Sequence, residues 1–352
     1  MKKLLFSFLL ALILIPSSLH AQKKIDFPQG GFQDTSPEDF AAKNLSANHY
    51  NELWTYHISL ENGVQIIYSF SINDFGSFKS RVTGAKLIVS WKDGKTYVVN
   101  KEYAVKDLIN QPENKYLRLH PDRPFWAKGS FDKEHVLNFQ NEKDGVSYDL
   151  NLSLYNIAQG KKLGNGVYKV DGNEIGLFLL IPHAKVKGYV EINGERIKAE
   201  GKAYMDHFYV NNASTKIINR SYRVKSGDDK DGVMFHFMSL KDGSKNNYIG
   251  YGVHYQDGIP TLISPSAIEA KENTKVRGIK LENELIVTPF QMDPINLKID
   301  KHLNTYSIMD ELSGFQKFFA KRVIGGELIE MNGTLEVNNK QDGYFYYLVT
   351  DG

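Results

Sequence analysis

The sequence predicts an all-β protein built from two tandem antiparallel β-barrel domains. Three observations lead to this fold class. The chain is rich in aromatic residues, with 20 Tyr and 20 Phe among 352 residues, and aromatic residues favour strands. Turn signals typical of β-hairpins recur along the first half with few helix-period stretches between them. The second half then restarts a similar pattern, which indicates a second unit.

The strand pattern begins at His49, and four hairpins are predicted in the first half. Each has two alternating apolar segments around a dipeptide that favours a tight turn. The four turns are expected at Asn62-Gly63, Asp93-Gly94, Asp144-Gly145 and Asn193-Gly194. Because successive hairpins pair antiparallel, the expected topology is an up-and-down meander that closes as a barrel or a sandwich.

The segment before the first strand is polar and irregular, and it is interpreted as a lead-in arm. Within residues 22–48, the stretch "SPEDFAAKNL" predicts a short turn of helix. Ser36 is placed to cap this turn, and Asp39 follows three residues later, as in a capping box.

The two halves resemble each other at two places. "DGVMFHFMSL" in the second half is similar to "NGVQIIYSFSI" in the first, and the stretch from Phe319 matches the stretch from His183 in the order Ala-Lys, Val, Gly, Asn-Gly. Two divergent copies of one β-unit explain the chain length, although short hairpins can also match by chance. Only the first copy continues into Tyr204-Met205-Asp206-His207, and this asymmetry points to function.

The first 21 residues have the pattern of a secretory signal peptide. Two lysines precede an apolar run from Leu4 to Ile15, and small residues lead to Ala21. An uncleaved anchor is the alternative, but the run is shorter than the ~20 residues that span a bilayer. The mature chain is therefore expected in the periplasm or outside the cell, with no transmembrane segment after cleavage.

Length and composition narrow the function classes. Residues 22–352 suffice for two domains, and the pattern places them at 22–202 and 203–352. The chain has no cysteine, so its stability must come from core burial rather than disulfides. The formal net charge of +2 falls to near zero without Lys2 and Lys3. A nucleic-acid partner is thus excluded, because phosphate binding needs a concentrated basic surface.

The stretch "LLIPHAKVKGYVEINGERIKAEGKAYMDHFYV", residues 179–210, resembles a known family. The lipocalin-like proteins grouped with carotenoid 1,2-hydratases and AttH proteins share its motif elements. The matching residues are Ile181-Pro182, Lys185-Val186, Gly188, Gly194, Gly201 and Tyr204-Met205-Asp206-His207, with Ala203 in place of a glycine. The resemblance implies two lipocalin-like barrels, a small apolar ligand at their junction and no cofactor.

The resemblance also implies roles for individual residues. In the hydratases, the Tyr and Asp of the motif act in catalysis with a preceding His-x-Trp pair, so Tyr204 and Asp206 are the candidate catalytic residues. The His-x-Trp pair falls on Leu177 and Leu179, which are both leucine. These two positions are expected at the ligand site, and their identity argues against true hydration of a carotenoid.

Strand geometry places the motif relative to the barrels. Residues two apart share a face, so Tyr204 and Asp206 point together, whereas Met205 and His207 point to the other side. If Ile197 faces the first barrel's interior, Tyr204 and Asp206 lie in the seam between the domains.

Two interpretations of this pair remain open. A carboxyl group beside apolar surface can keep its proton and act as an acid, with Tyr204 assisting. Alternatively, Asp206 accepts backbone hydrogen bonds and Tyr204 fills the interface. His207 is a candidate ligand contact or a hydrogen-bonded interface residue.

Other candidate residues carry weaker signals. His236 and His254 lie in separate strands and would need to meet His207 to bind a metal, and no cluster with zinc-like spacing is visible, so no metal is predicted. Trp126 lies in "LRLHPDRPFWAKGSF", which is expected to be an irregular segment that either covers a barrel mouth and contacts ligand or packs for stability.

The sequence leaves two functions open. The first is an enzyme that hydrates, isomerises or cyclises an isoprenoid, polyene or lipid, with Asp206 as the acid. The second is a non-catalytic carrier or chaperone of a hydrophobic molecule. The oligomeric state is not predicted.

Overall fold

The computed structural model describes residues 24–74, 76, 79–241, 248–276, 278–311, 317–318, 321–322 and 325–351. The predicted signal peptide, residues 1–21, lies outside the described residues. None of the helices in the described part of the chain is long and apolar enough to cross a bilayer.

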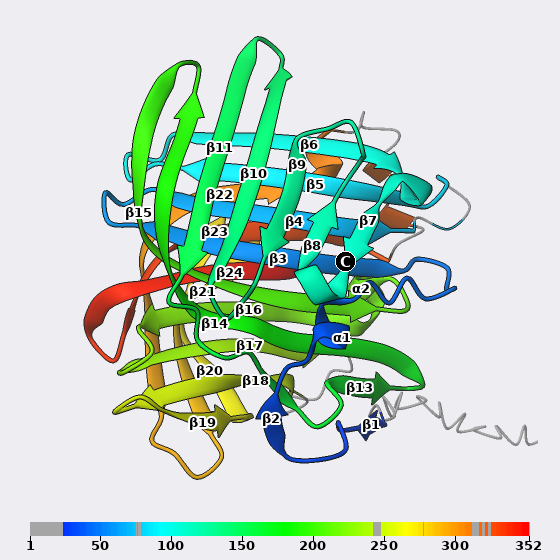
Figure 1. Cartoon of the computed structure of the whole chain (residues 1–352). Coiled ribbons are helices and arrows are strands. Elements are labelled where there is room, and N and C mark those ends of the chain that lie inside the picture. Colours follow the sequence, from blue (N-terminus) through cyan, green and yellow to red (C-terminus); the bar gives the residue numbers. More distant parts are fainter. Residues whose placement is uncertain are drawn as a thin grey trace, which may run out of the picture.

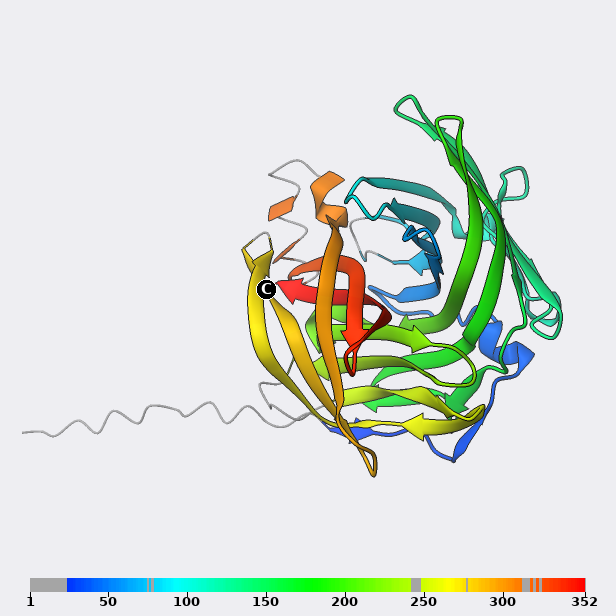
Figure 2. The ribbon, with the colours of Figure 1, turned by 90° about the vertical axis from the view of Figure 1, so that its left-hand side faces the viewer.

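The all-β fold class is confirmed, since two strongly curled antiparallel sheets form two tandem barrel domains (Figures 1 and 2). The first sheet consists of β1 (Ile25–Asp26), β2 (Phe32–Asp34), β3 (Asn51–Leu60), β4 (Gln65–Asn73), β5 (Val82–Ser90), β6 (Thr96–Ala104), β7 (Ile109–Gln111), β8 (Tyr116–Arg118), β9 (Phe125–Gly129), β10 (Glu134–Lys143), β11 (Val146–Tyr155), β12 (Lys161–Leu163), β13 (Val167–Val170), β14 (Asn173–Ile192) and β15 (Glu195–Val210).

The second sheet follows after a short helical connection. It consists of β16 (Ile218–Gly227), β17 (Gly232–Leu240), β18 (Tyr248–Gln256), β19 (Ile259–Ile263), β20 (Pro265–Val276), β21 (Ile279–Pro289), β22 (Ile295–Ser307), β23 (Glu327–Val337) and β24 (Lys340–Asp351). The helical elements whose bounds the described residues define are α1 (Pro37–Phe40), α2 (Ser214–Ile217) and the 3-10 turns η2 (Val105–Asp107), η3 (Pro112–Asn114) and η4 (Ile308–Glu311).

The two sheets share one strand order. The first runs β6-β5-β4-β3-β15-β14-β11-β10-β9, and then continues to β8 and β7. The second runs β19-β18-β17-β16-β24-β23-β22-β21-β20. In both, a meander of four strands is joined to the last hairpin of the unit. This order makes β4 and β17 equivalent, as the similarity of "NGVQIIYSFSI" and "DGVMFHFMSL" predicts.

The second sequence match is out of register. Asn193 and Gly194 form the turn between β14 and β15, with left-handed φ values of 54° and 78°. Asn332 and Gly333 instead lie within β23, where they pair with β22 and β24. The turn equivalent to Asn193-Gly194 is Asn338-Asn339, so the shared dipeptide does not mark equivalent positions.

The local elements of the first half form where the turn chemistry predicts them. The four predicted turns connect β3 to β4, β5 to β6, β10 to β11 and β14 to β15. In the lead-in arm, the backbone N–H of Ser36 donates to the Asp39 carboxylate over 2.7 Å at the start of α1. These signals are local, so they hold without knowledge of the tertiary structure.

The change of sheet falls later than residues 202 to 203. β15 pairs with β14 and β3 through Val210, and the second sheet begins only with β16. The C-terminal half of β15, which carries Tyr204 to His207, therefore belongs to the first barrel. A strand cannot be divided between sheets here, because its hydrogen-bonding partners on both sides are in the first sheet.

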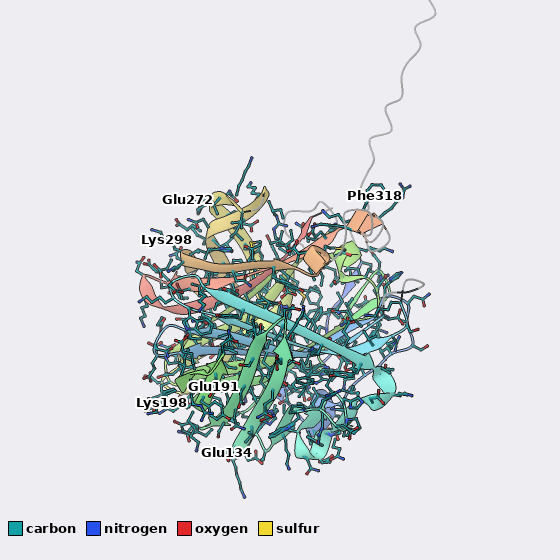
Figure 3. The ribbon with its side chains drawn as sticks, turned by 90° about the horizontal axis from the view of Figure 1, so that it is seen from above. Glu134, Glu191, Lys198, Glu272, Lys298 and Phe318 are labelled. Carbon is teal, nitrogen blue, oxygen red and sulfur yellow. The ribbon has the colours of Figure 1, made fainter. Side chains whose placement is uncertain are left out.

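Among the described residues, three large apolar clusters and a small fourth one, of Ile67, Ile88 and Tyr346, fill the molecule. The first barrel is packed with aromatic side chains such as Trp54, Tyr68 and Phe139, and the second with residues such as Phe235 and Leu297. A third cluster lies between the barrels and contains residues from both, among them Leu177, Leu179, Tyr204, Phe208, Met234, Met238 and Tyr344. Charged side chains such as Glu134, Lys198, Glu272 and Lys298 stand on the outside (Figure 3).

Candidate functional site

Tyr204 and Asp206 lie on β15 with their side chains outside the first barrel. Tyr204 belongs to the interdomain cluster, whereas its neighbours Ala203 and Met205 belong to the first barrel's core. Asp206 is fully buried. The period-2 alternation of β15 thus turns the two functional candidates toward the second barrel, in the seam where strand geometry places them.

Asp206 forms a buried ion pair with Arg223 of β16. Arg223 Nε donates to Asp206 Oδ2 over 2.8 Å, and both side chains are almost completely buried. Burial alone would raise the pKa of Asp206, but the charge of Arg223 and then the contact with His236 outweigh it and hold that pKa well below its usual value. Asp206 is therefore ionised at neutral pH and links the two domains.

Two further polar side chains complete this group. His236 of β17 places Nδ1 3.5 Å from Asp206 Oδ2, and its Nε2 lies 2.9 Å from Ser221 Oγ. Arg223 also donates from Nη1 to Ser221 Oγ over 3.3 Å. We call Asp206, Ser221, Arg223 and His236 the seam polar group. Its members come from β15, β16 and β17, so it exists only when the two barrels are packed together.

Tyr204 lies beside this group in a stack of rings. Its ring centroid is 4.3 Å from that of His57 on β3 and 5.5 Å from that of Tyr344 on β24. Within the described part of the chain, neither the Tyr204 hydroxyl nor Asp206 Oδ1 has a hydrogen-bond partner. Burial raises the pKa of Tyr204 well above its usual value, so the phenol is neutral.

Leu177 and Leu179 lie next to Asp206. Leu179 is opposite Asp206 in the β14–β15 ladder, and Leu177 is opposite Phe208. Both leucines are fully buried in the interdomain cluster. The register shift that follows on β14 accommodates Ile181-Pro182, since a proline is tolerated in a strand at a bulge. The two leucines make the wall beside Asp206 apolar.

His207 is not in the seam. Its Nδ1 lies 2.6 Å from the carbonyl oxygen of Asp39, its Nε2 lies 2.9 Å from Glu52, and its ring stacks on Trp54 at 4.5 Å. Trp54 belongs to the core of the first barrel. His207 therefore ties the lead-in arm to the barrel interior, and the structure does not bring it together with Tyr204 and Asp206.

Trp126 is also remote from the pair. The segment expected to be irregular forms the short hairpin β8–β9, and Trp126 pairs with Arg118 and Asn138. Its neighbours Phe125 and Ala127 fill the first barrel, so Trp126 faces the outside of that barrel. It does not line the interdomain cavity.

The histidines considered for metal binding are separated. His236 lies in the seam polar group, His254 lines a separate pocket with Lys202 and Asp228, and His207 lies inside the first barrel. Among the residues that the structure describes, no group of three or more His, Cys, Asp or Glu is arranged to hold a metal ion.

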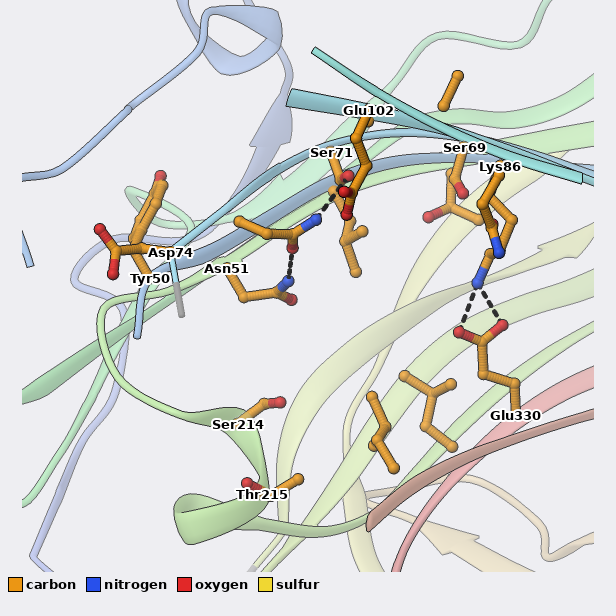
Figure 4. A pocket seen from close by; sticks show the side chains of 18 of the residues that line it. Tyr50, Asn51, Ser69, Ser71, Asp74, Lys86, Glu102, Ser214, Thr215 and Glu330 are labelled. Carbon is orange, nitrogen blue, oxygen red and sulfur yellow. Dashed lines mark hydrogen bonds and ion pairs between the residues drawn. The ribbon is translucent and has the colours of Figure 1, made fainter. Parts of the chain in front are cut away.

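A cavity of about 190 Å³ lies between the barrels (Figure 4). Strands β3 to β6 form one wall, and β23, β24 and the residues around α2 form the other. Leu53, Leu328 and Leu348 give it apolar surface, and Thr55 and Ser69 give it hydroxyl groups. Lys86 and Glu330 form an ion pair across it, and the Tyr346 hydroxyl donates to Glu330 over 2.6 Å.

The cavity is adjacent to the seam polar group. Thr55 lines the cavity and is opposite Asp206 in the β3–β15 ladder. Tyr346 also lines the cavity, and the Arg223 guanidinium lies 5.5 Å from the centroid of its ring. The cavity wall therefore includes direct neighbours of both Asp206 and Arg223.

The residues that sequence reasoning missed are Ser221, Arg223, His57 and the Lys86–Glu330 pair. β16 reads "INRSYRVKSG", with Ser221, Arg223 and Lys225 on one face and Tyr222 and Val224 on the other. That alternation is typical of a strand with one face in water. Here the polar face is buried, and no local signal distinguishes the two situations.

The fold is similar to that of two crystal structures. A candidate AttH protein from Nitrosomonas europaea has a TM-score of 0.63 and 15% sequence identity, covering 92% of this chain and 98% of that chain. Kievitone hydratase from Nectria haematococca has a TM-score of 0.51 and 12% identity, covering 91% of this chain and 93% of that chain. No protein-family model and no curated protein matches the sequence.

These similarities confirm, at the level of the fold, the resemblance that residues 179–210 carry. The structural neighbours include an AttH-type protein and a hydratase. Because one fold supports many reactions, the function has to be argued from the cavity and the residues around it.

Proposed function

We propose that the chain binds a small molecule, with an apolar body and polar substituents, in the cavity between the two barrels. The observation that carries the proposal is the cavity itself, whose wall combines leucine side chains with hydroxyl groups and the Lys86–Glu330 pair. Ligand sites of this composition use apolar surface for affinity and a few polar groups for orientation.

The size of the cavity limits the ligand. Its volume of about 190 Å³ is similar to that of an engineered cavity of about 150 Å³ that takes benzene. A ligand about the size of one substituted ring fits this space, whereas a long isoprenoid or polyene chain is too large. The ion pair in the wall also favours a ligand with polar groups over a pure hydrocarbon.

The electrostatics favour binding over acid-catalysed hydration, isomerisation or cyclisation by Asp206. A general acid must hold a proton at working pH, and Arg223 keeps Asp206 ionised. Leu177 and Leu179 offer no replacement proton donor. A carrier function needs no proton donor, and the ion pair then serves to hold the two walls of the cavity together.

Secretion is part of the proposal and rests on residues 1–21 alone. The chain is proposed to reach the periplasm or the exterior after cleavage following Ala21. Expression in a bacterial host, fractionation and N-terminal sequencing test this. A mature chain beginning at Gln22 supports the proposal, and an intact Met1 in the cytoplasmic fraction contradicts it.

Binding can be tested with p-nitrophenol, a ring of suitable size with polar groups at both ends. Ser69 lines the cavity (Figure 4). Equilibrium dialysis should show binding to the parent protein, and Ser69→Phe should weaken it at least about tenfold by occupying the space. The matched control, Ser69→Ala, leaves the space open and should bind within about threefold of the parent. Equal binding by Ser69→Phe would place the ligand elsewhere.

A further inference from the structure

Three members of the seam polar group have the connectivity of a nucleophilic triad. Ser221 Oγ lies 2.9 Å from His236 Nε2, and His236 Nδ1 lies 3.5 Å from Asp206 Oδ2. A serine, a histidine and a carboxylate in this order activate the hydroxyl for attack on a carbonyl, and such triads are recognised by geometry rather than by sequence position. The second contact is too long for a hydrogen bond, and His236 Nδ1 has no hydrogen-bond partner among the described residues. Catalytic hydrogen bonds are often long in a free site and shorten when substrate binds.

Arg223 fixes the direction of the hydrogen bonds. A guanidinium only donates, so Ser221 Oγ accepts from Arg223 Nη1 and must direct its own proton elsewhere. His236 Nε2 is the acceptor within reach. The proton of the neutral imidazole then resides on Nδ1, facing the Asp206 carboxylate. This is the arrangement in which the histidine can take the serine proton.

His236 is neutral at physiological pH. Burial and then the charge of Arg223 lower its pKa to about 4, against the opposing effect of Asp206. It can therefore accept a proton at pH 7, and the nearby guanidinium is placed to stabilise negative charge that develops beside Ser221.

A small side chamber gives access to Ser221. A cavity of about 20 Å³ is lined by Ser221, Arg223 and His236. It shares five wall residues with the larger interdomain cavity, namely Asn51, Leu53, Ser214, Leu328 and Leu348, so the two spaces adjoin. A volume of this size holds about one water molecule or a group as small as a methyl. A short acyl group can enter the side chamber while the rest of the molecule stays in the larger cavity.

We propose that Ser221 is the nucleophile of an esterase site that cleaves small acyl esters of ring-sized alcohols or phenols. Ser221 Oγ attacks the carbonyl carbon and passes its proton to His236 Nε2. The ester C–O bond breaks, and His236 returns the proton to the leaving oxygen. Water then attacks the acyl-serine with His236 as base, and a carboxylic acid and free Ser221 result. Asp206 is the positioning residue that holds His236 in the required tautomer.

This proposal rests on the interdomain cavity as the ligand site, and it goes beyond binding. The full chain is incubated with p-nitrophenyl acetate at pH 7, and release of p-nitrophenol is followed. Acid-quenched samples are digested and searched by mass spectrometry for acetylated Ser221. We expect this adduct in the parent protein, and a loss of kcat/KM of at least about 100-fold in Ser221→Ala and in His236→Gln.

The matched control is Ser239→Ala. Ser239 lies on the same strand as His236 but on the other face of that strand. The kcat/KM of the Ser239→Ala variant should therefore equal that of the parent protein. The side chamber also predicts chain-length selectivity, with p-nitrophenyl butyrate cleaved at least about tenfold more slowly than the acetate. The kcat/KM of the parent should be level from pH 5 to pH 8, because His236 is already neutral there.

The outcomes separate this proposal from the binding function. Absence of acetylated Ser221 together with a Ser221→Ala rate equal to that of the parent would overturn the esterase site, whether or not p-nitrophenol binds. If p-nitrophenol binds under those conditions, the binding function survives alone. If it does not bind, both proposals fail. The adduct is sought in the parent protein, so the test does not depend on the folding of any variant.

Discussion

The seam faces of the two barrels have equivalent backbones and opposite chemistry. Thr55↔Ser69 is the fifth cross-strand pair counted from the β3–β4 turn, and Arg223↔His236 is the fifth from the β16–β17 turn. The strands that flank these pairs place Asp206 beside Thr55 and Tyr346 beside Arg223. At the same location, the first barrel thus presents a carboxylate with two hydroxyl groups, and the second presents a guanidinium, an imidazole and a phenol.

This difference explains why the halves need each other. A buried charge is costly unless it is paired. Each barrel alone would leave one charge of the Asp206–Arg223 pair either exposed to water or buried without its partner. The repeated unit supplies the scaffold, whereas the substitutions on its seam face supply the site. The Tyr-x-Asp pair occurs in one copy only, because Arg223 and Tyr344, which contact Asp206 and Tyr204 across the seam, belong to the other copy. His207 instead contacts residues of the first barrel and its lead-in arm.

The largest expected effect is the loss of stability at acid pH. Measuring it compares a histidine in the seam with a histidine inside the first barrel. Burial lowers the pKa of His135 to about 3, inside the first barrel, and that of His236 to about 4, in the seam. An unfolded histidine has a pKa near 6.5. Between pH 6.5 and about pH 4, the unfolded chain therefore binds protons that these folded histidines do not. Stability should fall across this window by about 1.4 kcal/mol per pH unit for each such histidine.

Urea unfolding at pH 7, 6 and 5 measures this slope. His135→Leu and His236→Leu should each reduce the slope of stability against pH by about 1.4 kcal/mol per pH unit, since each removes one buried, neutral histidine. If only the His236 variant flattens the slope, the acid sensitivity belongs to the seam alone. A slope unchanged in both variants would contradict the burial of these neutral imidazoles as its cause.

The next effect comes from breaking the ion pair on one side of the seam. Arg223→Met leaves Asp206 buried without its partner, and the free energy of unfolding should fall by about 3 to 5 kcal/mol. At the equivalent position of the first barrel, Thr55→Val keeps the shape and should cost no more than about 1 kcal/mol. Urea denaturation of both variants measures the difference.

A double variant sharpens this result. Replacing the pair with Arg223→Met and Asp206→Leu removes both charges, so stability should recover most of the loss. A double variant as unstable as Arg223→Met alone would show that packing, rather than the unpaired carboxylate, causes the loss.

The smallest effect concerns the stacked tyrosines, one from each barrel. The hydroxyl groups of Tyr204 and Tyr344 have no hydrogen-bond partner within the described residues. Tyr204→Phe and Tyr344→Phe should therefore each change the free energy of unfolding by less than about 1 kcal/mol, because no hydrogen bond is lost. Thermal denaturation checks this. Tyr346→Phe is the control, because it loses the hydrogen bond to Glu330. If Tyr204→Phe lowered the free energy of unfolding as much as Tyr346→Phe does, the Tyr204 hydroxyl would have to have a hydrogen-bond partner.

Much of the fold could be predicted from the sequence, because its determinants are local. The turn dipeptides position the four hairpins of the first half, and the Ser36–Asp39 spacing predicts α1. The alternation along β15 places Tyr204 and Asp206 on one face and His207 on the other. The residues of the 179–210 stretch pointed to the fold that the structural neighbours share.

The chemistry of the site was decided by tertiary structure. The sequence could place Asp206 beside apolar surface, but its protonation depends on Arg223, which another strand of another barrel brings to 2.8 Å. Ser221 and Arg223 lie on a polar face that looks solvent-exposed in sequence and becomes buried only when the barrels pack. A strand's alternation specifies which residues share a face. What that face meets, and hence the charge state and partners of each group on it, is determined only by packing between elements far apart in the chain.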